Sequence, residues 1–249
     1  MIWFTILFYT LLPRNLAIKE LLAEDLNLLS KPLNPLIAAN AVNVVVKSDT
    51  KALGNKMTVY YLEASPPSTT KYRGDLLYLH GAAFSSHDWN KNKPSILQMS
   101  AAAGYRTIAI DLPGFSYSRS TGTAANDRIT FMSSVMESLR IHKPVIVSPS
   151  ASGSYSVPYV LKNQKKISGF VPVAPCCVHS DAWNNFTVPT LVVYGSEDRA
   201  SISKGLLQIP NRNLVIIPDA PHAAYIKKPV DFVTALINFM YTIHPRVFN

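Results

Sequence analysis

The chain is poor in cysteine, and its residues show no spacing that would bind a metal. Its only two cysteines, Cys176 and Cys177, are adjacent. Neighbouring cysteines rarely form a structural disulfide because the bridge geometry strains so small a ring, so a disulfide framework is excluded. We interpret both as small apolar residues at a strand end rather than as a redox pair. Neither a metal nor a resident cofactor is expected.

The chain also lacks an uninterrupted apolar stretch of bilayer length at its N-terminus. Residues 1–12 are almost wholly apolar, but a membrane-spanning helix needs about 20 such residues. No basic residue precedes them and no convincing signal-peptide cleavage site follows closely. For the N-terminal segment, residues 1–39, three interpretations stay open: a membrane anchor, a targeting segment and a helix packed on the domain. A cytoplasmic and a membrane-associated location both remain open with them.

Charged residues are scarce, and their balance is basic. They make up 16% of the chain, against 48% hydrophobic residues, and the formal net charge is +9. Disorder over most of the length is therefore excluded. The basic residues are scattered and no aromatic-interleaved basic stripe occurs, which favours a solvated surface over nucleic-acid binding. Anionic membranes and acidic or CoA-bearing substrates remain compatible with this charge.

The order of apolar segments predicts an α/β fold. Because no internal repeat or low-complexity linker interrupts residues 40–249, we expect one domain there. Alternating strands and helices indicate a mostly parallel sheet with helices on both faces, and the continuous apolar strands indicate burial on both faces. The predicted strands are residues 42–46, 57–62, 75–79, 107–110, 145–147, 170–173, 191–194 and 214–217, and the predicted helices are 16–29, 96–103, 126–141, 152–161 and one that begins at Pro229.

Three candidate catalytic residues follow predicted strands in the order Ser150, Asp198 and His222. In open α/β sheets, ligands gather beyond the carboxyl ends of the strands, so these side chains should meet there. Serine, aspartate and histidine in this chain order form the triad of α/β-hydrolases. The histidine would take the serine proton, and the carboxylate would orient the imidazole and stabilise its cation. The pattern predicts acyl transfer or hydrolysis.

Two of these assignments have rivals nearby. A nucleophile elbow needs small residues two positions before and after the serine, and glycines usually occupy both. Here Ser148 and Ser152 do so, and Ser152 is itself a rival nucleophile. We prefer Ser150 because it lies at the predicted strand–helix junction, whereas Ser152 fits a helix-capping role better. Glu197 competes with Asp198, and we prefer Asp198 because its short side chain lies further round the turn.

The transition state would also need donors for its developing negative charge. The backbone N–H of Ala151, directly after the nucleophile, is one expected donor. A second should come from the loop after His80 and Gly81, and we assign it to the N–H of Ala82. His80 is expected to close a strand rather than act as the base.

The segment before the strand at 191–194 is too short for a lid. Only the twelve residues 178–189 precede that strand in the stretch where many α/β-hydrolases insert a lid domain. We therefore expect a minimal lid or none, and a shallow, open pocket. Such a pocket favours small acyl groups, or acyl groups presented on a larger carrier, over long lipid chains.

The chain resembles the abhydrolase domain-containing protein 14 family of the α/β-hydrolase superfamily, from about Leu76 to Tyr241. The unusual Ser-Pro-Ser-x-Ser-Gly elbow at residues 148–153 is the most specific motif. Further matching motifs are residues 79–81, 84–86 with Trp89, 104–106, 111–114, 169–175, 222–225 and 228–229. Ser116 stands where a glycine is common, and Ala220-Pro221 replaces the usual Ala-Gly before the histidine.

This resemblance implies a nucleophile at Ser150, an acid at Asp198 and a base at His222. It implies esterase-type activity on short acyl groups, including deacylation of acylated lysine with transfer to CoA. Some members carry an N-terminal membrane segment, which suits residues 1–12. The expected partners are a small acyl substrate or an acylated protein. The alternative is a catalytically weak binding or adaptor protein, since the elbow lacks its glycines and fold does not fix function.

Overall fold

The computed structural model describes residues 28–54, 57–118, 127–178, 180–199, 205–210 and 212–244. The apolar segment 1–12, most of the predicted helix 16–29 and His179 lie outside the described residues. Within the described ranges, no helix has both the length and the apolar character needed to cross a membrane.

The described residues form an α/β fold around one sheet in the order β1-β2-β4-β3-β5-β6-β7-β8. The first two pairings, β1 with β2 and β2 with β4, are antiparallel, and the pairings from β4 to β8 are parallel. This confirms the predicted mostly parallel sheet. The strands are β1 (Val46–Gly54), β2 (Met57–Ala64), β3 (Gly74–Tyr78), β4 (Tyr105–Ile110), β5 (Val145–Pro149), β6 (Gly169–Val173), β7 (Thr190–Gly195) and β8 (Arg212–Ile217).

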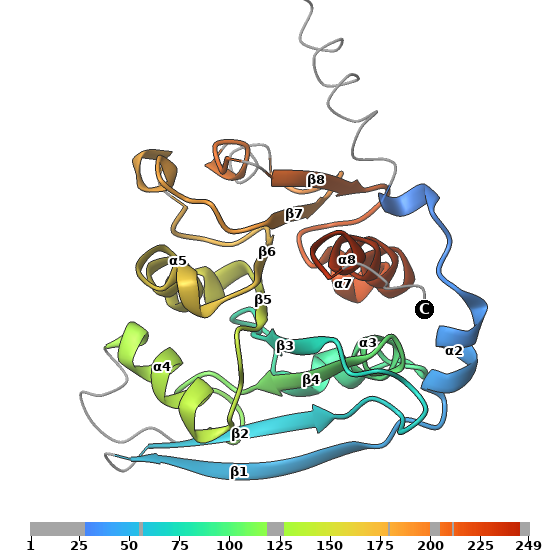
Figure 1. Cartoon of the computed structure of the whole chain (residues 1–249). Helices are drawn as coiled ribbons and strands as arrows, with labels where there is room; N and C mark the ends of the chain where they lie inside the picture. Colours follow the sequence, from blue (N-terminus) through green and yellow to red (C-terminus); the bar gives the residue numbers. More distant parts are fainter. Residues whose placement is uncertain are drawn as a thin grey trace, which may run out of the picture.

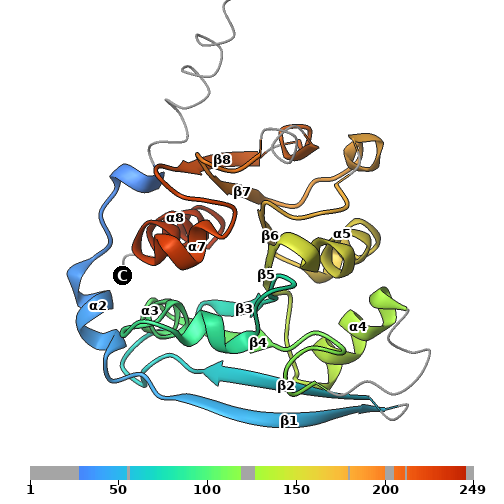
Figure 2. The same cartoon turned by 180° about the vertical axis from the view of Figure 1, so that it is seen from behind.

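Helices cover both faces of the sheet, as expected from the alternating pattern (Figures 1 and 2). The first face carries α2 (Pro35–Ala41), α3 (Ile96–Ala102), α7 (Ala224–Lys227) and α8 (Pro229–Ile243), and the second carries α4 (Arg128–Ser138) and α5 (Gly153–Lys162). Each face buries its own apolar cluster. The central strands β5 and β6 are buried along their whole length, which explains their continuous apolar sequence.

The prediction of a strand at residues 42–46 was wrong. Helix α2 ends at Ala41, just before this range, with Pro35 in its first turn and the Asn34 side chain accepting a hydrogen bond from the Leu36 N–H at 3.0 Å. The first strand begins only at Val46, and most of its residues are exposed. Because β1 is an edge strand whose side chains mostly face solvent, it needs no apolar pattern. The periodicity of apolar residues therefore could not predict it.

Pro158 lies inside α5 rather than near its end. The sequence predicts a helix at 152–161 that Pro158 must bend unless it lies near the helix end. The structure divides the region into the short 3-10 helix η3 (Ser150–Ser152) and then α5. The final helix does begin at Pro229, as predicted, and Asp231 lies in its first turn.

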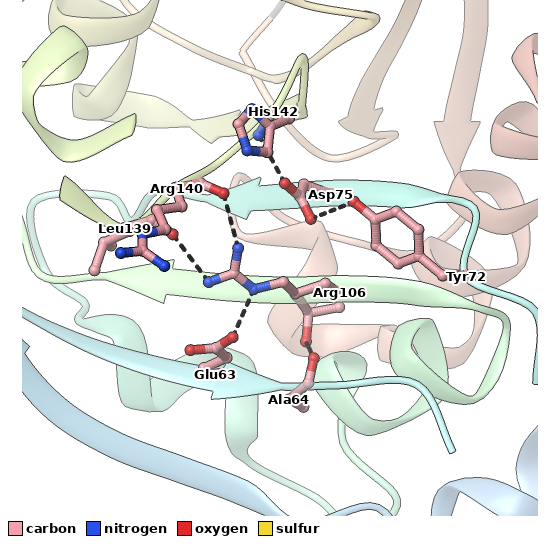
Figure 3. Close-up of polar contacts among 9 residues, drawn as sticks. Glu63, Ala64, Tyr72, Asp75, Arg106, Leu139, Arg140 and His142 are labelled. Atoms are coloured by element: carbon pink, nitrogen blue, oxygen red, sulfur yellow. Dashed lines mark hydrogen bonds and ion pairs between the residues drawn. The ribbon is translucent and has the colours of Figure 1, made fainter. Parts of the chain in front are cut away.

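Two buried or half-buried charged side chains fasten the connection between α4 and β5 (Figure 3). The Arg106 guanidinium donates to the Glu63 carboxylate at 2.6 Å and to the carbonyls of Leu139 and Arg140 at 3.0 and 3.1 Å. The Asp75 carboxylate accepts from the backbone N–H of His142 at 2.8 Å. These bonds satisfy carbonyls at the end of α4 that have no partner within the helix. They fix the chain where it enters β5, the strand that leads to Ser150.

Candidate active site

The turn after β5 has the geometry of a nucleophile elbow. Ser150 directly follows the strand, and its φ of 50° lies in the left-handed region, which is strained for a residue with a β-carbon. Gly153 lets the chain close tightly there, because a β-carbon at Gly153 would lie 2.3 Å from the carbonyl oxygen of Cys176. Strain of this kind between strand and helix is what holds a nucleophile out from an α/β-hydrolase sheet.

The structure brings Ser150, His222 and Asp198 into one hydrogen-bonded chain. The Ser150 Oγ lies 2.9 Å from His222 Nε2, and His222 Nδ1 lies 2.9 Å from an Asp198 carboxylate oxygen. Both distances are within the range required for proton transfer. The Asp198 side chain is only 4% exposed, whereas that of His222 is 40% exposed. The carboxylate is thus held away from water while the imidazole faces the solvent side, where a substrate would enter.

Three parallel strands place these residues at the same edge of the sheet. Ser150 follows the end of β5, Asp198 follows β7, and His222 follows β8. The backbone N–H of Asp198 donates to the Gly195 carbonyl at 3.0 Å, which turns the chain back toward the histidine. Glu197, the rival acid, is exposed, and Asp198 is the carboxylate that contacts the imidazole.

The rival serine, Ser152, faces away from the histidine. Its hydroxyl is fully buried and donates to the Pro149 carbonyl at 2.6 Å. Its oxygen also lies 2.9 Å from that of Ser148, which in turn lies 2.6 Å from that of Ser156. The expectation that Ser152 caps a helix is only partly met. It occupies the position before α5, but its side chain accepts no capping hydrogen bond.

We therefore expect Ser152→Ala to lower the stability of the fold and to have little effect on the rate of hydrolysis. Loss of the buried hydroxyl should lower the free energy of unfolding by about 1–3 kcal/mol, because the Pro149 carbonyl loses its donor. The rate of p-nitrophenyl acetate hydrolysis should stay within about tenfold of wild type, which corresponds to a change of less than about 1.4 kcal/mol in the activation free energy. Urea unfolding and initial rates on the folded variant measure both. A loss of activity as large as that of Ser150→Ala would make Ser152 the nucleophile.

The loop after β3 lies against Ser150. A β-carbon on Gly81 would lie 3.2 Å from the β-carbon of Ser150, so the stretch that contains Ala82 borders the serine. The buried Trp89 indole fixes this loop by donating to the Leu79 carbonyl at 2.8 Å and stacking on Tyr225 with ring centroids 4.3 Å apart. This placement suits the Ala82 N–H for the role expected of it. The Ala151 N–H belongs to the elbow itself.

His80 is a buried structural residue, as expected, and it also positions the loop. It is 0% exposed, and its Nε2 accepts from the Leu112 N–H at 2.9 Å. Its Nδ1 lies 2.9 Å from the Gly81 carbonyl, so a neutral ring with a proton on Nδ1 satisfies both contacts. Desolvation by burial lowers the pKa of His80 below its usual value, because burial disfavours the charged form. Sequence reasoning missed this bridging role.

A neutral buried histidine makes folding stability fall at mildly acid pH. Below about pH 6.5, His80 gains a proton in the unfolded chain but resists it in the folded protein, so the free energy of unfolding decreases as the pH falls. His244, whose pKa burial also lowers, adds to the same trend. In His80→Gln, which keeps an acceptor for Leu112, the decrease between about pH 7.5 and 5 should be shallower. Urea unfolding at each pH tests this, and an unchanged slope would contradict it.

The placement of the two cysteines at a strand end was wrong. Cys176 and Cys177 lie three and four residues beyond β6 and are both exposed free thiols. They therefore do not pack as small apolar residues at the end of a strand. Their position beside the elbow could not be read from the sequence, because it depends on how the chain turns after β6.

Within the described residues, no group of three or more His, Cys, Asp or Glu side chains could hold a metal ion. Three hollows among the described residues are lined by none of the three triad residues. One, of about 540 Å³, is lined by residues between α2 and β2, including Asn40, Val45 and Glu63. Ser150, Asp198 and His222 do not line it.

Known proteins share this fold and sequence. The alpha/beta hydrolase fold family matches residues 76–187. Mouse "Protein ABHD14A" is 36% identical over 73% of the chain and 76% of its own length. The chain belongs to the ABHD14 family of α/β-hydrolases. Human "Putative protein-lysine deacylase ABHD14B" is 35% identical over 73% of the chain and 90% of its own length.

A solved structure agrees on the fold. The predicted CIB-like hydrolase from Thermoplasma acidophilum superposes with a TM-score of 0.72 at 24% identity, over 80% of this chain and all of that one. The recognised resemblance and the predicted fold class are thus confirmed. The chain is a member of a hydrolase-fold family within which some relatives have names that denote a deacylase.

One departure from the common ABHD14 pattern has a physical explanation. Ser116 adopts a φ of 45°, in the left-handed region where glycine has no steric cost, which accounts for the glycine common at this position. The neighbouring Ser118 supports the loop, since its hydroxyl donates to the Asp111 carbonyl at 2.7 Å and accepts from the Tyr60 N–H at 2.9 Å.

Proposed function

We propose that the protein is a serine hydrolase or acyltransferase that acts on short acyl esters or acylated amines. The observation that carries this proposal is the hydrogen-bonded chain from Ser150 Oγ through His222 to the buried Asp198 carboxylate, with 2.9 Å at each contact. A serine with no adjacent base is a poor nucleophile, and this arrangement supplies the base and the group that orients it.

The reaction begins as Ser150 Oγ attacks the acyl carbonyl carbon and passes its proton to His222 Nε2. The carbonyl oxygen becomes an oxyanion, which the N–H groups of Ala151 and Ala82 stabilise; one such donor is worth about 3 kcal/mol. The bond to the leaving alcohol or amine then breaks, and the imidazolium returns the proton to it. An acyl-enzyme on Ser150 remains. Asp198 holds the imidazole in the productive tautomer and stabilises its cation.

Transfer of the acyl group from Ser150 to a second molecule completes the catalytic cycle. Water, or a thiol such as that of CoA, gives its proton to His222 and attacks the acyl-enzyme, which releases Ser150. The basic net charge of +9 would attract an anionic acceptor. In the described part of the segment between β6 and β7, the structure shows the short 3-10 helix η5 (Ser180–Trp183), which suits an open pocket and an acyl group presented on a larger carrier.

Acylated lysine is the amine substrate we favour. Support comes from the human and rat relatives named "Putative protein-lysine deacylase ABHD14B". The test is an acetyl-lysine peptide incubated with the enzyme, with and without CoA, and followed by mass spectrometry. We expect deacetylated peptide, and acetyl-CoA when CoA is present. Turnover of p-nitrophenyl acetate without any reaction of the peptide would restrict the proposal to ester substrates.

The competing function is binding without catalysis. It gains support only if the folded protein hydrolyses neither p-nitrophenyl acetate nor the peptide. Ser148 and Ser152 in place of elbow glycines are the feature that would favour it.

A further inference from the structure

The two exposed thiols form a pair directly behind the elbow. The sulfur of Cys176 lies 2.7 Å from that of Cys177, and these are the only cysteines in the chain. Cys177 adopts a φ of 67°, a left-handed conformation that is uncommon for a residue with a β-carbon. Two adjacent, solvent-reachable thiols in contact can react with one reagent molecule together.

Cys176 touches three residues of the elbow. Its N–H donates to the Ser150 carbonyl at 2.9 Å, and its sulfur lies 3.6 Å from the Ala151 carbonyl oxygen. Its own carbonyl oxygen fills the space at Gly153, where a β-carbon would lie 2.3 Å away. Any change in the backbone at Cys176 is therefore transmitted to the nucleophile and to the N–H of Ala151.

We propose that Cys176 and Cys177 are a reversible oxidation site, which a peroxide closes into a vicinal disulfide, and that closure displaces the elbow. The formation of the disulfide concerns the thiols alone. The effect of its closure on the elbow rests on the proposed hydrolase function. The substrate class for the site is a two-electron oxidant of the peroxide type.

The chemistry balances in two steps. The sulfur of Cys177 attacks one peroxide oxygen and breaks the O–O bond, which gives a sulfenic acid and releases water from hydrogen peroxide. The Cys176 sulfur then attacks the Cys177 sulfur, and a second water leaves with the Cys176 proton. The Cys176 thiol is directed at the Ala151 carbonyl oxygen, and desolvation by burial and the contact with Cys177 raise its pKa to about 11, so Cys176 keeps its proton in the first step. Two thiols are oxidised and one peroxide is reduced.

Closure must move the backbone. A disulfide bond is about 2.05 Å long and usually joins residues whose α-carbons are roughly 4.4–6.8 Å apart, whereas adjacent α-carbons are about 3.8 Å apart across a trans peptide. The eight-membered ring can form only if torsions around the peptide between the two cysteines change. Because such strain makes the bond easier to reduce, the site should open again in a thiol reductant.

The experiment measures the oxidation state of the two cysteines and the hydrolysis rate separately. Wild type and Cys177→Ser are treated with limiting hydrogen peroxide, alkylated and digested with trypsin. The expected peptide, residues 167–199, holds both cysteines and no methionine. In wild type it should lose the mass of two hydrogens and accept no alkyl group, and dithiothreitol should restore both sites. The Cys177→Ser peptide should not lose two hydrogens. If treated wild type still has two thiols that can be alkylated, or contains separate sulfinic acids, the proposed oxidation site is contradicted.

The second readout is p-nitrophenyl acetate hydrolysis by the same samples. Oxidised wild type should lose about 10- to 100-fold in rate, a loss typical of a small displacement of catalytic groups, and recover it in dithiothreitol. Cys177→Ser should start near the wild-type rate and keep it through the treatment. A disulfide that forms without a change in rate would overturn the coupling to the elbow. Untreated protein that is inactive but forms the disulfide would refute the proposed function and leave the oxidation site supported.

Discussion

Ser150→Ala should lower the rate of p-nitrophenyl acetate hydrolysis by at least about 10³-fold, and the protein should remain folded. The hydroxyl is the group that lies 2.9 Å from His222 Nε2, and no other described serine makes this contact. Without it, an acyl-enzyme cannot form, and only binding and the oxyanion donors remain; in triad enzymes the residual rate is small. Initial rates under saturating ester measure the loss.

The control for this variant is its stability. Alanine lacks only the hydroxyl, so the strain at φ 50° stays and the free energy of unfolding should change by less than about 1 kcal/mol. Circular dichroism and urea unfolding check that the variant is native. A folded Ser150→Ala protein with wild-type turnover would show that the hydrolysis has another origin.

Gly195→Ala should be the most damaging single-methyl change near the site. A β-carbon there would lie 2.0 Å from the carbonyl oxygen of Ala220 and 2.4 Å from that of Pro221. Both contacts are with backbone, which cannot rotate aside. The variant must therefore push apart the loop that carries Asp198 and the loop that carries His222. We expect a loss of activity of about 10²-fold or more and a cost in stability of about 1–3 kcal/mol from overpacking.

Gly54→Ala is the matched control for the loss of a glycine. Gly54 ends β1, and a β-carbon there would meet nothing within 4 Å, but its φ of 83° is strained for alanine. The substitution should cost about 1–2 kcal/mol in stability and leave the hydrolysis rate unchanged. If Gly195→Ala loses no more activity than Gly54→Ala, the two triad loops do not depend on their close approach at Gly195.

The sequence was informative where burial dictates the pattern. Strands β5, β6 and β7 are apolar on both faces, so their runs predicted the buried parallel strands that the structure contains. The turns after β5, β7 and β8 then placed Ser150, Asp198 and His222 at one edge of the sheet. The order of the three residues along the chain added the expectation that they would interact, and the structure places them in contact.

The sequence did not predict features that depend on solvent exposure or on tertiary contacts. Strand β1 is an exposed edge whose residues lack an apolar period, and the short α2 depends on an Asn34 cap before a proline. The bridge from His80 to Leu112 joins residues that are 32 positions apart. The contact between Cys176 and the elbow likewise exists only once β5 and β6 are side by side. The last two contacts leave no local signal in the sequence.

The elbow explains how serines can replace the usual glycines. Ser148 and Ser152 are both fully buried, and small residues are required there so that strand and helix can approach. Their hydroxyls would be costly if left without partners. They bond to one another, to Ser156 and to the Pro149 carbonyl, which satisfies them inside the turn. The degenerate sequence motif is therefore compatible with the geometry of an intact elbow.

The most direct test of the central claim is covalent labelling with a fluorophosphonate, located by peptide mass spectrometry. Such a reagent is attacked by an activated serine and stays attached to it. We predict one label per chain, on Ser150, with no label on Ser152 and none at all on the Ser150→Ala protein. A folded wild type that takes no label, or takes it on another residue, would contradict an activated nucleophile at the end of β5.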